Sequence, residues 1–116
     1  SYVTGTDTPL GVGMTCPTTA STRQQQDTSE WCRTLQGASE LNGTSQVGAM
    51  IGARGCIEQL NADTYMVTVA WQGLTPVAAP PASVACGLDA YDTPGTPCEN
   101  DLCRRAVTAI IRPATL

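Results

Sequence analysis

Six cysteines in a chain of 116 residues without histidine constrain this fold more than any other feature. Their spacing matches neither a zinc ribbon nor a CxxC redox motif, and the commonest zinc ligand is absent. We therefore interpret the cysteines as disulfide-bonded rather than as metal ligands or free thiols. Disulfides persist in an oxidising compartment, so we expect a periplasmic, cell-surface or extracellular protein.

Six cysteines allow many pairings, and the sequence alone does not choose between them. We favour one bridge from a loop to the adjoining helix, one from a strand to the returning chain, and one that closes a short C-terminal loop. These bridges are Cys16–Cys32, Cys56–Cys86 and Cys98–Cys103. A Cys86–Cys98 bridge would contradict the last two pairings.

The composition indicates a thin core and an acidic surface. Phenylalanine is absent and aromatic residues make up 4% of the chain, so the core depends on smaller apolar side chains. The net charge is −4 and all six basic residues are arginines, which argues against nucleic-acid binding. No apolar run is long enough for a membrane span or signal peptide. We expect a mature or truncated piece, starting at Ser1, without its export or anchoring segment.

The clearest secondary-structure signal is an alternating strand at residues 64–73. Its first row contains Tyr65, Val67, Val69 and Trp71, and the residues between them form a second row. Aromatic and β-branched residues with a period of two are typical of a half-buried strand. We expect this strand to be the centre of a small antiparallel sheet, with Trp71 in the core.

Further segments complete an α+β fold with about four antiparallel strands and one short helix in one domain, residues 1–116. Strands are predicted at 54–60, joined to the central strand by the turn 61–63, at 83–87, and at 104–112. Both rows of the last strand are partly apolar, so we expect it to be covered on both sides or to lie beside a segment outside this chain. We interpret residues 40–52 as a glycine-rich connector that contains a short extended piece at 47–51.

A helix is predicted over residues 20–36, with cap candidates in 18–22 and Gly37 as its end. Trp31 and Leu35 are four residues apart and share one helical face. Trp31 either packs on the sheet or contacts a partner, and the sequence leaves both open. Asn42-Gly43-Thr44 matches an N-glycosylation sequon, but we favour an ordinary Asn-Gly turn.

No catalytic motif is present, because histidine is absent and no GxSxG motif occurs. Asp89, Asp92, Glu99 and Asp101 lie in a polar loop and resemble no EF-hand in their spacing. We favour a solvated acidic loop over a calcium site, and we expect no raised carboxyl pKa there. We therefore expect no catalytic residue, metal or cofactor.

Several segments together resemble the PilV-type minor pilins, also called type IV pilus modification proteins. They are Glu30-Trp31-Cys32, the run from Gly52 to Ile57, the run from Val67 to Leu74, and Arg104-Arg105-Ala106-Val107-Thr108 with the strand that follows to Leu116. The resemblance covers most of the chain from about Ser29 onward.

The resemblance implies a pilin fold, in which a long, partly apolar N-terminal helix lies across a small antiparallel sheet. This chain departs from the family because it lacks that helix and the processing site, which implies a soluble head domain. The first row of the central strand would then be partly exposed or covered by the Trp31 helix.

The family implies a non-enzymatic subunit of the complex that primes pilus assembly and lies at the filament tip. It is anchored in the inner membrane, facing the periplasm, before assembly, and is on the cell-surface pilus afterwards. Partners would be other minor pilins and the major pilin, with a host surface possible. Partner contact is expected at the Trp31 helix and in and beside the loop 88–103, through Trp31, Asp89, Tyr91, Asp92, Glu99, Asp101, Arg104 and Arg105.

A different class of function fits the same cysteine framework. A secreted disulfide-rich binding module, either an adhesin or an inhibitor, would also lack catalytic groups. The residues encoded immediately before Ser1 discriminate between the two. A prepilin cleavage site with an apolar helix indicates a pilin, and an ordinary signal peptide indicates a secreted module.

Overall fold

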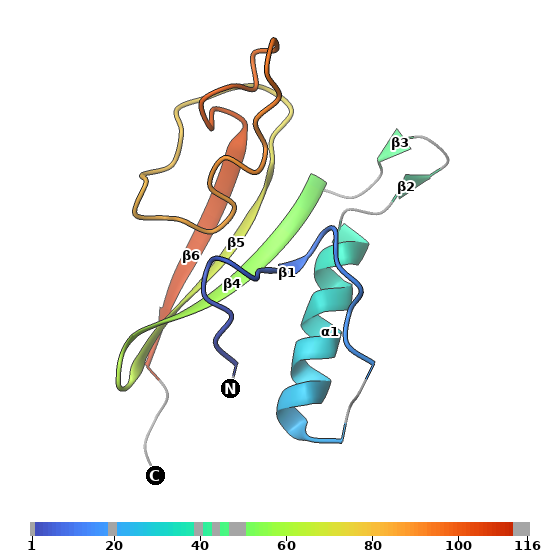
Figure 1. Ribbon diagram of the computed structural model, residues 1–116, viewed down its shortest axis with the longest axis vertical. Coiled ribbons are helices and arrows are strands. Elements are labelled where there is room, and N and C mark those ends of the chain that lie inside the picture. Colours follow the sequence, from blue (N-terminus) through green and yellow to red (C-terminus); the bar gives the residue numbers. More distant parts are fainter. Residues whose placement is uncertain (1, 19–20, 39–40, 43–44, 47–50, 113–116) are drawn as a thin grey trace.

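The computed structural model describes residues 2–18, 21–38, 41–42, 45–46 and 51–112. A four-stranded antiparallel sheet with the order β1-β4-β5-β6 carries one helix beside it (Figure 1). The predicted α+β class is therefore confirmed. The elements are β1 (Leu10–Gly11), α1 (Arg23–Ala38), β2 (Leu41–Asn42), β3 (Ser45–Gln46), β4 (Ile51–Asn61), β5 (Thr64–Gln72) and β6 (Arg104–Ile111).

The predicted hairpin forms the long axis of the sheet. β4 and β5 pair in antiparallel register from Asn61↔Thr64 outward, and β5 pairs with β6 on its other side. The backbone N–H of Asp63 donates to the side-chain oxygen of Asn61 at 3.2 Å, which closes the turn as an Asx turn. The predicted central strand therefore lies inside the sheet, between its predicted hairpin partner β4 and β6.

The strand predicted at 83–87 is wrong, because this segment folds into consecutive turns. Val84 N–H donates to Pro81 O and Leu88 N–H donates to Ala85 O. The carbonyls of Val84 and Cys86 accept from the Arg104 side chain, so they are unavailable to a ladder. The fourth strand is instead β1, which lies in a segment predicted as loop and pairs with β4 through Leu10↔Gly55 and Gly11↔Arg54.

Helix α1 begins with a capping box. The Thr22 hydroxyl accepts from the Gln25 N–H at 3.1 Å, and the Gln25 side-chain oxygen accepts from the Thr22 N–H at 3.2 Å. The helix continues through Gly37, which was predicted to end it. Strands β2 and β3 form a separate two-stranded pair on either side of residues 43–44. The sequon's Gly43 and Thr44, and residues 47–50 of the predicted extended piece, lie outside the described residues.

The N-terminal segment joins α1 to the sheet. The Gln36 amide donates to Gly11 O at 3.0 Å, and the Ser29 hydroxyl donates to Pro17 O at 2.7 Å. On the sheet side, Thr4 N–H donates to Ile57 O, and Ile57 N–H donates to the Thr4 hydroxyl at 2.9 Å. Cys16–Cys32 closes this unit covalently, as predicted.

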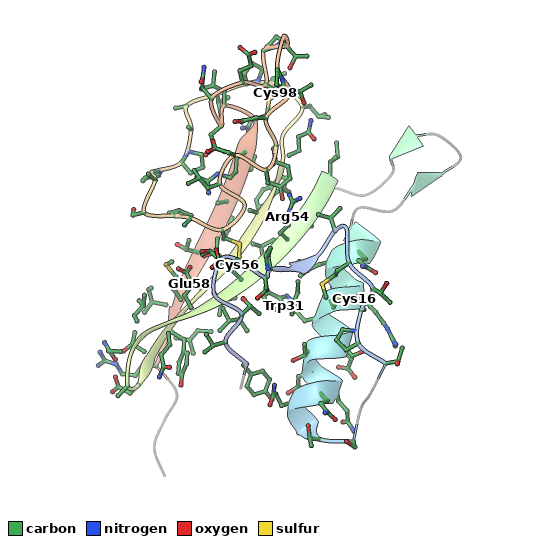
Figure 2. The ribbon with its side chains drawn as sticks, in the orientation of Figure 1. Cys16, Trp31, Arg54, Cys56, Glu58 and Cys98 are labelled. Atoms are coloured by element: carbon green, nitrogen blue, oxygen red, sulfur yellow. A yellow bond between two sulfur atoms is a disulfide. The ribbon has the colours of Figure 1, made fainter. Side chains whose placement is uncertain are left out.

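Trp31 packs on the sheet, which was one of its two predicted positions (Figure 2). Its indole lies so close to Gly55 that a Cβ on Gly55 would lie 2.6 Å from two ring atoms. Leu35 contacts the same glycine, and Val69 packs against this cluster from β5. We call this side of the sheet the helix-side face; in register, it carries Gly55 and Ile57 of β4, Tyr65, Val67, Val69 and Trp71 of β5, and Arg105, Val107, Ala109 and Ile111 of β6.

Part of the opposite, loop-side face, at the end of the sheet where β6 begins, is covered by the segment 73–103, which we call the C-terminal loop (Figure 1). Cys56, Ala70, Cys86 and Tyr91 form the buried cluster there. The Cys56–Cys86 and Cys98–Cys103 bridges form with Cα–Cα distances of 5.9 Å and 5.1 Å. All three favoured pairings are therefore confirmed.

We predict that removing Cys56–Cys86 by the double substitution to alanine costs about 2–5 kcal/mol in the free energy of unfolding. The reason is that this bridge closes a sequence separation of 30 residues and is fully buried. Urea denaturation followed by tryptophan fluorescence measures the change. Removing Cys98–Cys103, with a separation of 5 residues, is the matched control and should cost less. An equal loss in the two variants would contradict this explanation.

Candidate functional site

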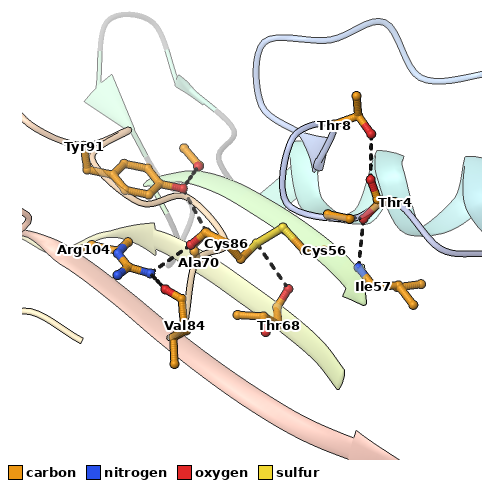
Figure 3. The surroundings of a disulfide bond; sticks show 12 residues. Thr4, Thr8, Cys56, Ile57, Thr68, Ala70, Val84, Cys86, Tyr91 and Arg104 are labelled. Atoms are coloured by element: carbon orange, nitrogen blue, oxygen red, sulfur yellow. Dashed lines mark hydrogen bonds between the residues drawn. A yellow bond between two sulfur atoms is a disulfide. The ribbon is translucent and has the colours of Figure 1, made fainter. Parts of the chain in front are cut away.

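The C-terminal loop is fixed to the sheet by the fully buried side chain of Arg104, at the start of β6. Its Nε donates to Asp101 Oδ2 at 2.7 Å, and its NH1 donates to the carbonyls of Val84 and Cys86 (Figure 3). A buried charge is tolerated only when it is paired and hydrogen-bonded. Arg104 therefore determines the path of the loop on both sides of the Cys56–Cys86 bridge.

Asp101 connects Arg104 to the rest of the loop. Its Oδ1 accepts from the Asp89 N–H at 3.2 Å, while its own N–H donates to Asp92 Oδ1 at 2.7 Å. Asp89, Asn100 and Asp101 have positive φ values of 57°, 56° and 65°. Aspartate and asparagine are the non-glycine residues that best tolerate this conformation. The aspartates thus serve the loop as turn formers and as hydrogen-bond acceptors.

Tyr91 completes the buried part of the loop. Its hydroxyl points at two carbonyl oxygens as a hydrogen-bond donor: Gly52 O at 2.7 Å and Ala70 O at 3.1 Å. The β4–β5 register shifts between Ile51 and Arg54, so the Tyr91 hydroxyl binds the Gly52 carbonyl at a place where the strand ladder is irregular. The Arg54 guanidinium lies 4.7 Å from the centre of the Tyr91 ring. Burial raises the pKa of Tyr91, and the neighbouring Arg54 opposes that shift.

The carboxylates of Asp89, Asp92 and Asp101 have oxygens within 4.8 Å of one another, which is the spacing that a cation could use. Both Asp101 oxygens already accept hydrogen bonds, one of them from a guanidinium. Asp101 is buried, so the prediction of a solvated acidic loop is wrong for this residue. Partial desolvation, followed by the charges of Asp92 and Asp101, raises the pKa of Asp89, which corrects the expectation of no raised carboxyl pKa.

The outer end of the loop is closed by Cys98–Cys103 and by short turns. Thr93 N–H donates to Cys98 O at 2.7 Å, and Gly95 N–H donates to the Glu99 carboxylate at 2.6 Å. Residues 93–97 are exposed. This tip presents polar and proline residues to solvent on a backbone that the bridge and turns hold in place.

The structure divides the residues predicted for partner contact into two groups. Tyr91, Asp101 and Arg104 are buried, so their side chains hold the loop and offer no direct contact surface. The second group is half-buried or exposed, and direct contact through it remains a prediction. Its members are Trp31, Asp89, Asp92, Glu99 and Arg105.

Apolar positions on β6 are exposed. Val107, Ile110 and Ile111 are 60%, 61% and 45% exposed, so the described residues do not cover this strand on both sides. The alternative expectation, that the strand lies beside a segment outside this chain, stays a prediction. Val107 and Ile111 belong to the helix-side face, opposite Val69 and Tyr65. Helix α1 contacts β1 and β4, at the other edge of the sheet (Figure 1). We call the part of the helix-side face on β5 and β6 the apolar strip; Trp71, predicted as core, lies on it half-buried.

A hollow of about 300 Å³ lies where the N-terminal segment meets the C-terminal loop. Asp7, Arg54 and Leu88 are among the residues that line it. No local sequence pattern predicts this hollow, because its walls come from three segments far apart in the chain. It is open to solvent and mixes one acidic and one basic side chain.

Comparison with protein-family models, with curated proteins and with solved structures found no match. Within the part of the chain that the structure describes, no helical segment has the length and hydropathy of a membrane span.

We predict that Asp101→Asn lowers the free energy of unfolding by about 3–5 kcal/mol, because it leaves the Arg104 charge buried without a counter-charge. Asparagine keeps the shape of the side chain and tolerates the positive φ of this position. Chemical denaturation measures the loss. Asp92→Asn is the control: its half-buried Oδ1 accepts a backbone N–H rather than a guanidinium, so we expect a cost of about 1 kcal/mol or less. Equal effects would contradict the role of the ion pair.

We also predict that Asp89→Asn makes the protein more stable at pH 7 and leaves stability unchanged well below pH 3.8, the ordinary pKa of this group. The raised pKa means that folding favours the protonated carboxyl, so ionisation above that pKa reduces stability. Asparagine removes this effect and tolerates the positive φ. Urea midpoints measured across this pH range test the prediction, and a variant that is less stable at pH 7 would contradict it.

Proposed function

We propose that this chain is the head domain of a minor pilin of a type IV pilus. It would be a non-enzymatic structural subunit of the assembly-priming complex at the filament tip, with other minor pilins and the major pilin as partners. Before assembly it would be anchored in the inner membrane and face the periplasm, and afterwards it would lie on the cell surface. The motifs described above, the antiparallel sheet and the three disulfides support the proposal.

The apolar strip is the observation that carries this proposal. A pilin packs a long, partly apolar helix across one face of its sheet. Here α1 covers the β1–β4 part of the helix-side face, and the part on β5 and β6 carries half-buried or exposed apolar side chains. The eight residues of β6 extend over about 27 Å, which a helix of about 18 residues matches in length. The strip thus offers a surface of the required character and length.

The exposed tip of the C-terminal loop supports the second candidate, a secreted binding module. A rigid, disulfide-closed loop can present residues 93–97 to a target with little loss of conformational entropy on binding. The codons before Ser1 separate the two candidates, because only a pilin gene would encode a prepilin cleavage site and an apolar helix there. An ordinary signal peptide at that place would overturn the pilin proposal.

We predict that Val107→Asp in the full-length protein abolishes pilus assembly, because it places a carboxylate where an apolar helix would pack. Val107 is 60% exposed in the head domain, so the isolated domain should retain its thermal midpoint. Pili per cell, counted by electron microscopy in a strain that carries only the variant gene, measure the effect.

Leu74→Asp is the matched control for this experiment. Leu74 is also apolar and is 86% exposed, but it lies in the C-terminal loop and is not part of the apolar strip. This variant should assemble pili normally. Normal assembly by both variants would remove the assigned role of the strip.

A further inference from the structure

Strand β6 is the last strand of the sheet, and its outer edge has no partner strand among the residues described. Its pairing with β5 runs without a register shift from Gln72↔Arg104 to Tyr65↔Ile111. An edge strand presents a row of backbone N–H and C=O groups that another extended chain can pair with. Eight regular residues make this row long enough for a stable ladder.

This edge lacks the features that usually prevent pairing. Residues 106–111 contain no charge and no proline, and β6 has no bulge. Exposed apolar side chains flank the edge on both faces: Val107 and Ile111 on the helix side and Ile110 on the loop side. A strand added to this edge would bury apolar surface on both faces of the sheet, in addition to forming backbone hydrogen bonds.

The charges at the two ends of β6 indicate which strand fits. Arg105 starts the helix-side row and donates to the carbonyls of Leu102 and Thr75, so its charge is not paired with a carboxylate within the described residues. Arg112 follows the other end, mostly exposed and 3.9 Å from Asp63. A second copy paired antiparallel along the whole of β6 would place its Arg112 opposite Arg104 on the same face of the sheet, and like charges at such positions are destabilising.

We propose that the outer edge of β6 binds an extended, apolar strand from another protein that carries acidic residues at its ends. The strand extends the sheet beyond β6, and its carboxylates lie near Arg105 and Arg112. This interaction uses the edge of the sheet, whereas the proposed pilin helix uses its helix-side face. The proposal therefore stands independently of the function proposed above, and an experiment on the isolated domain can test it.

The probe is a synthetic peptide of about eight residues that alternates valine and threonine between terminal glutamates, so that the two glutamates point to opposite faces of the sheet, as Arg105 and Arg112 do. Isothermal titration calorimetry measures its affinity, and hydrogen exchange locates it on the protein. We expect binding, with the amides of residues 105–111 gaining protection. The same peptide with terminal lysines should bind at least about tenfold more weakly, since it meets the arginines with like charge. Equal affinity of the two peptides, or protection elsewhere, would overturn the proposal.

Three protein variants sharpen the test. Ala109→Lys introduces a charge in the middle of the exposed edge and should weaken peptide binding at least about tenfold. Ala78→Lys is its matched control, because Ala78 is an exposed alanine in the C-terminal loop, and should bind as the unmodified domain does. Arg112→Glu should reduce the preference for glutamate ends; because Arg112 is mostly exposed, this change does not endanger folding. Equal binding by Ala109→Lys and Ala78→Lys would contradict the assigned edge.

Sedimentation of the domain without peptide separates this proposal from self-association. A monomer at micromolar concentration is expected, because the arginines oppose pairing between two copies. A dimer that the Ala109→Lys variant abolishes would show that the edge pairs with itself, and it would overturn the assignment of a different, acidic partner.

Discussion

The order of the C-terminal loop depends on the hydrogen bonds and the ion pair that the buried guanidinium of Arg104 makes with it. A loop of about thirty residues without helix or strand has few internal backbone bonds to hold it. Arg104 compensates, because one rigid side chain on β6 binds Asp101 on one side and two carbonyls around Cys86 on the other. Nε and NH1 of Arg104 have partners in the loop, whereas NH2 is buried without one among the described residues, and the Cys56–Cys86 bridge fixes the same place covalently. Polar and covalent constraints thus replace the large apolar core that this composition does not provide.

The two faces of the sheet are covered by different physical means. On the loop side, hydrogen bonds and a disulfide hold irregular chain against Ala70 and Thr68. On the helix side, the absence of a side chain at Gly55 lets Trp31 and Leu35 approach β4 closely. The close packing of α1 is confined to the β1–β4 edge of the sheet, because Gly55 is the position where the Trp31 indole lies against the strand. The β5–β6 part of that face therefore remains open, and both functional proposals concern β6.

The strands at 54–60, 64–73 and 104–112 were predictable because their signals are local: alternating apolar residues and an Asn-Asp turn. The three disulfide pairings were favoured among several that the sequence allows, and Cys56–Cys86 forms although the strand predicted to carry Cys86 does not. The segment 83–87 could not be recognised as turns, because its carbonyls bind an arginine about twenty residues away. Nor could the burial of Asp101 and Tyr91 be read from a polar loop, since it arises from long-range contacts. β1 was missed because two residues carry no periodicity.

The placement of the disulfides gives the molecule two covalently closed blocks. Cys16–Cys32 lies wholly within the N-terminal segment and α1, and the other two bridges lie wholly within the sheet and its loop. Besides the chain itself, the blocks are joined by the short β1–β4 pairing, the Thr4–Ile57 bonds and the packing of Trp31 and Leu35. Tension across this junction would peel the first block from the sheet without breaking a covalent bond. The chain would then lengthen at this junction while the bridges within each block stay intact.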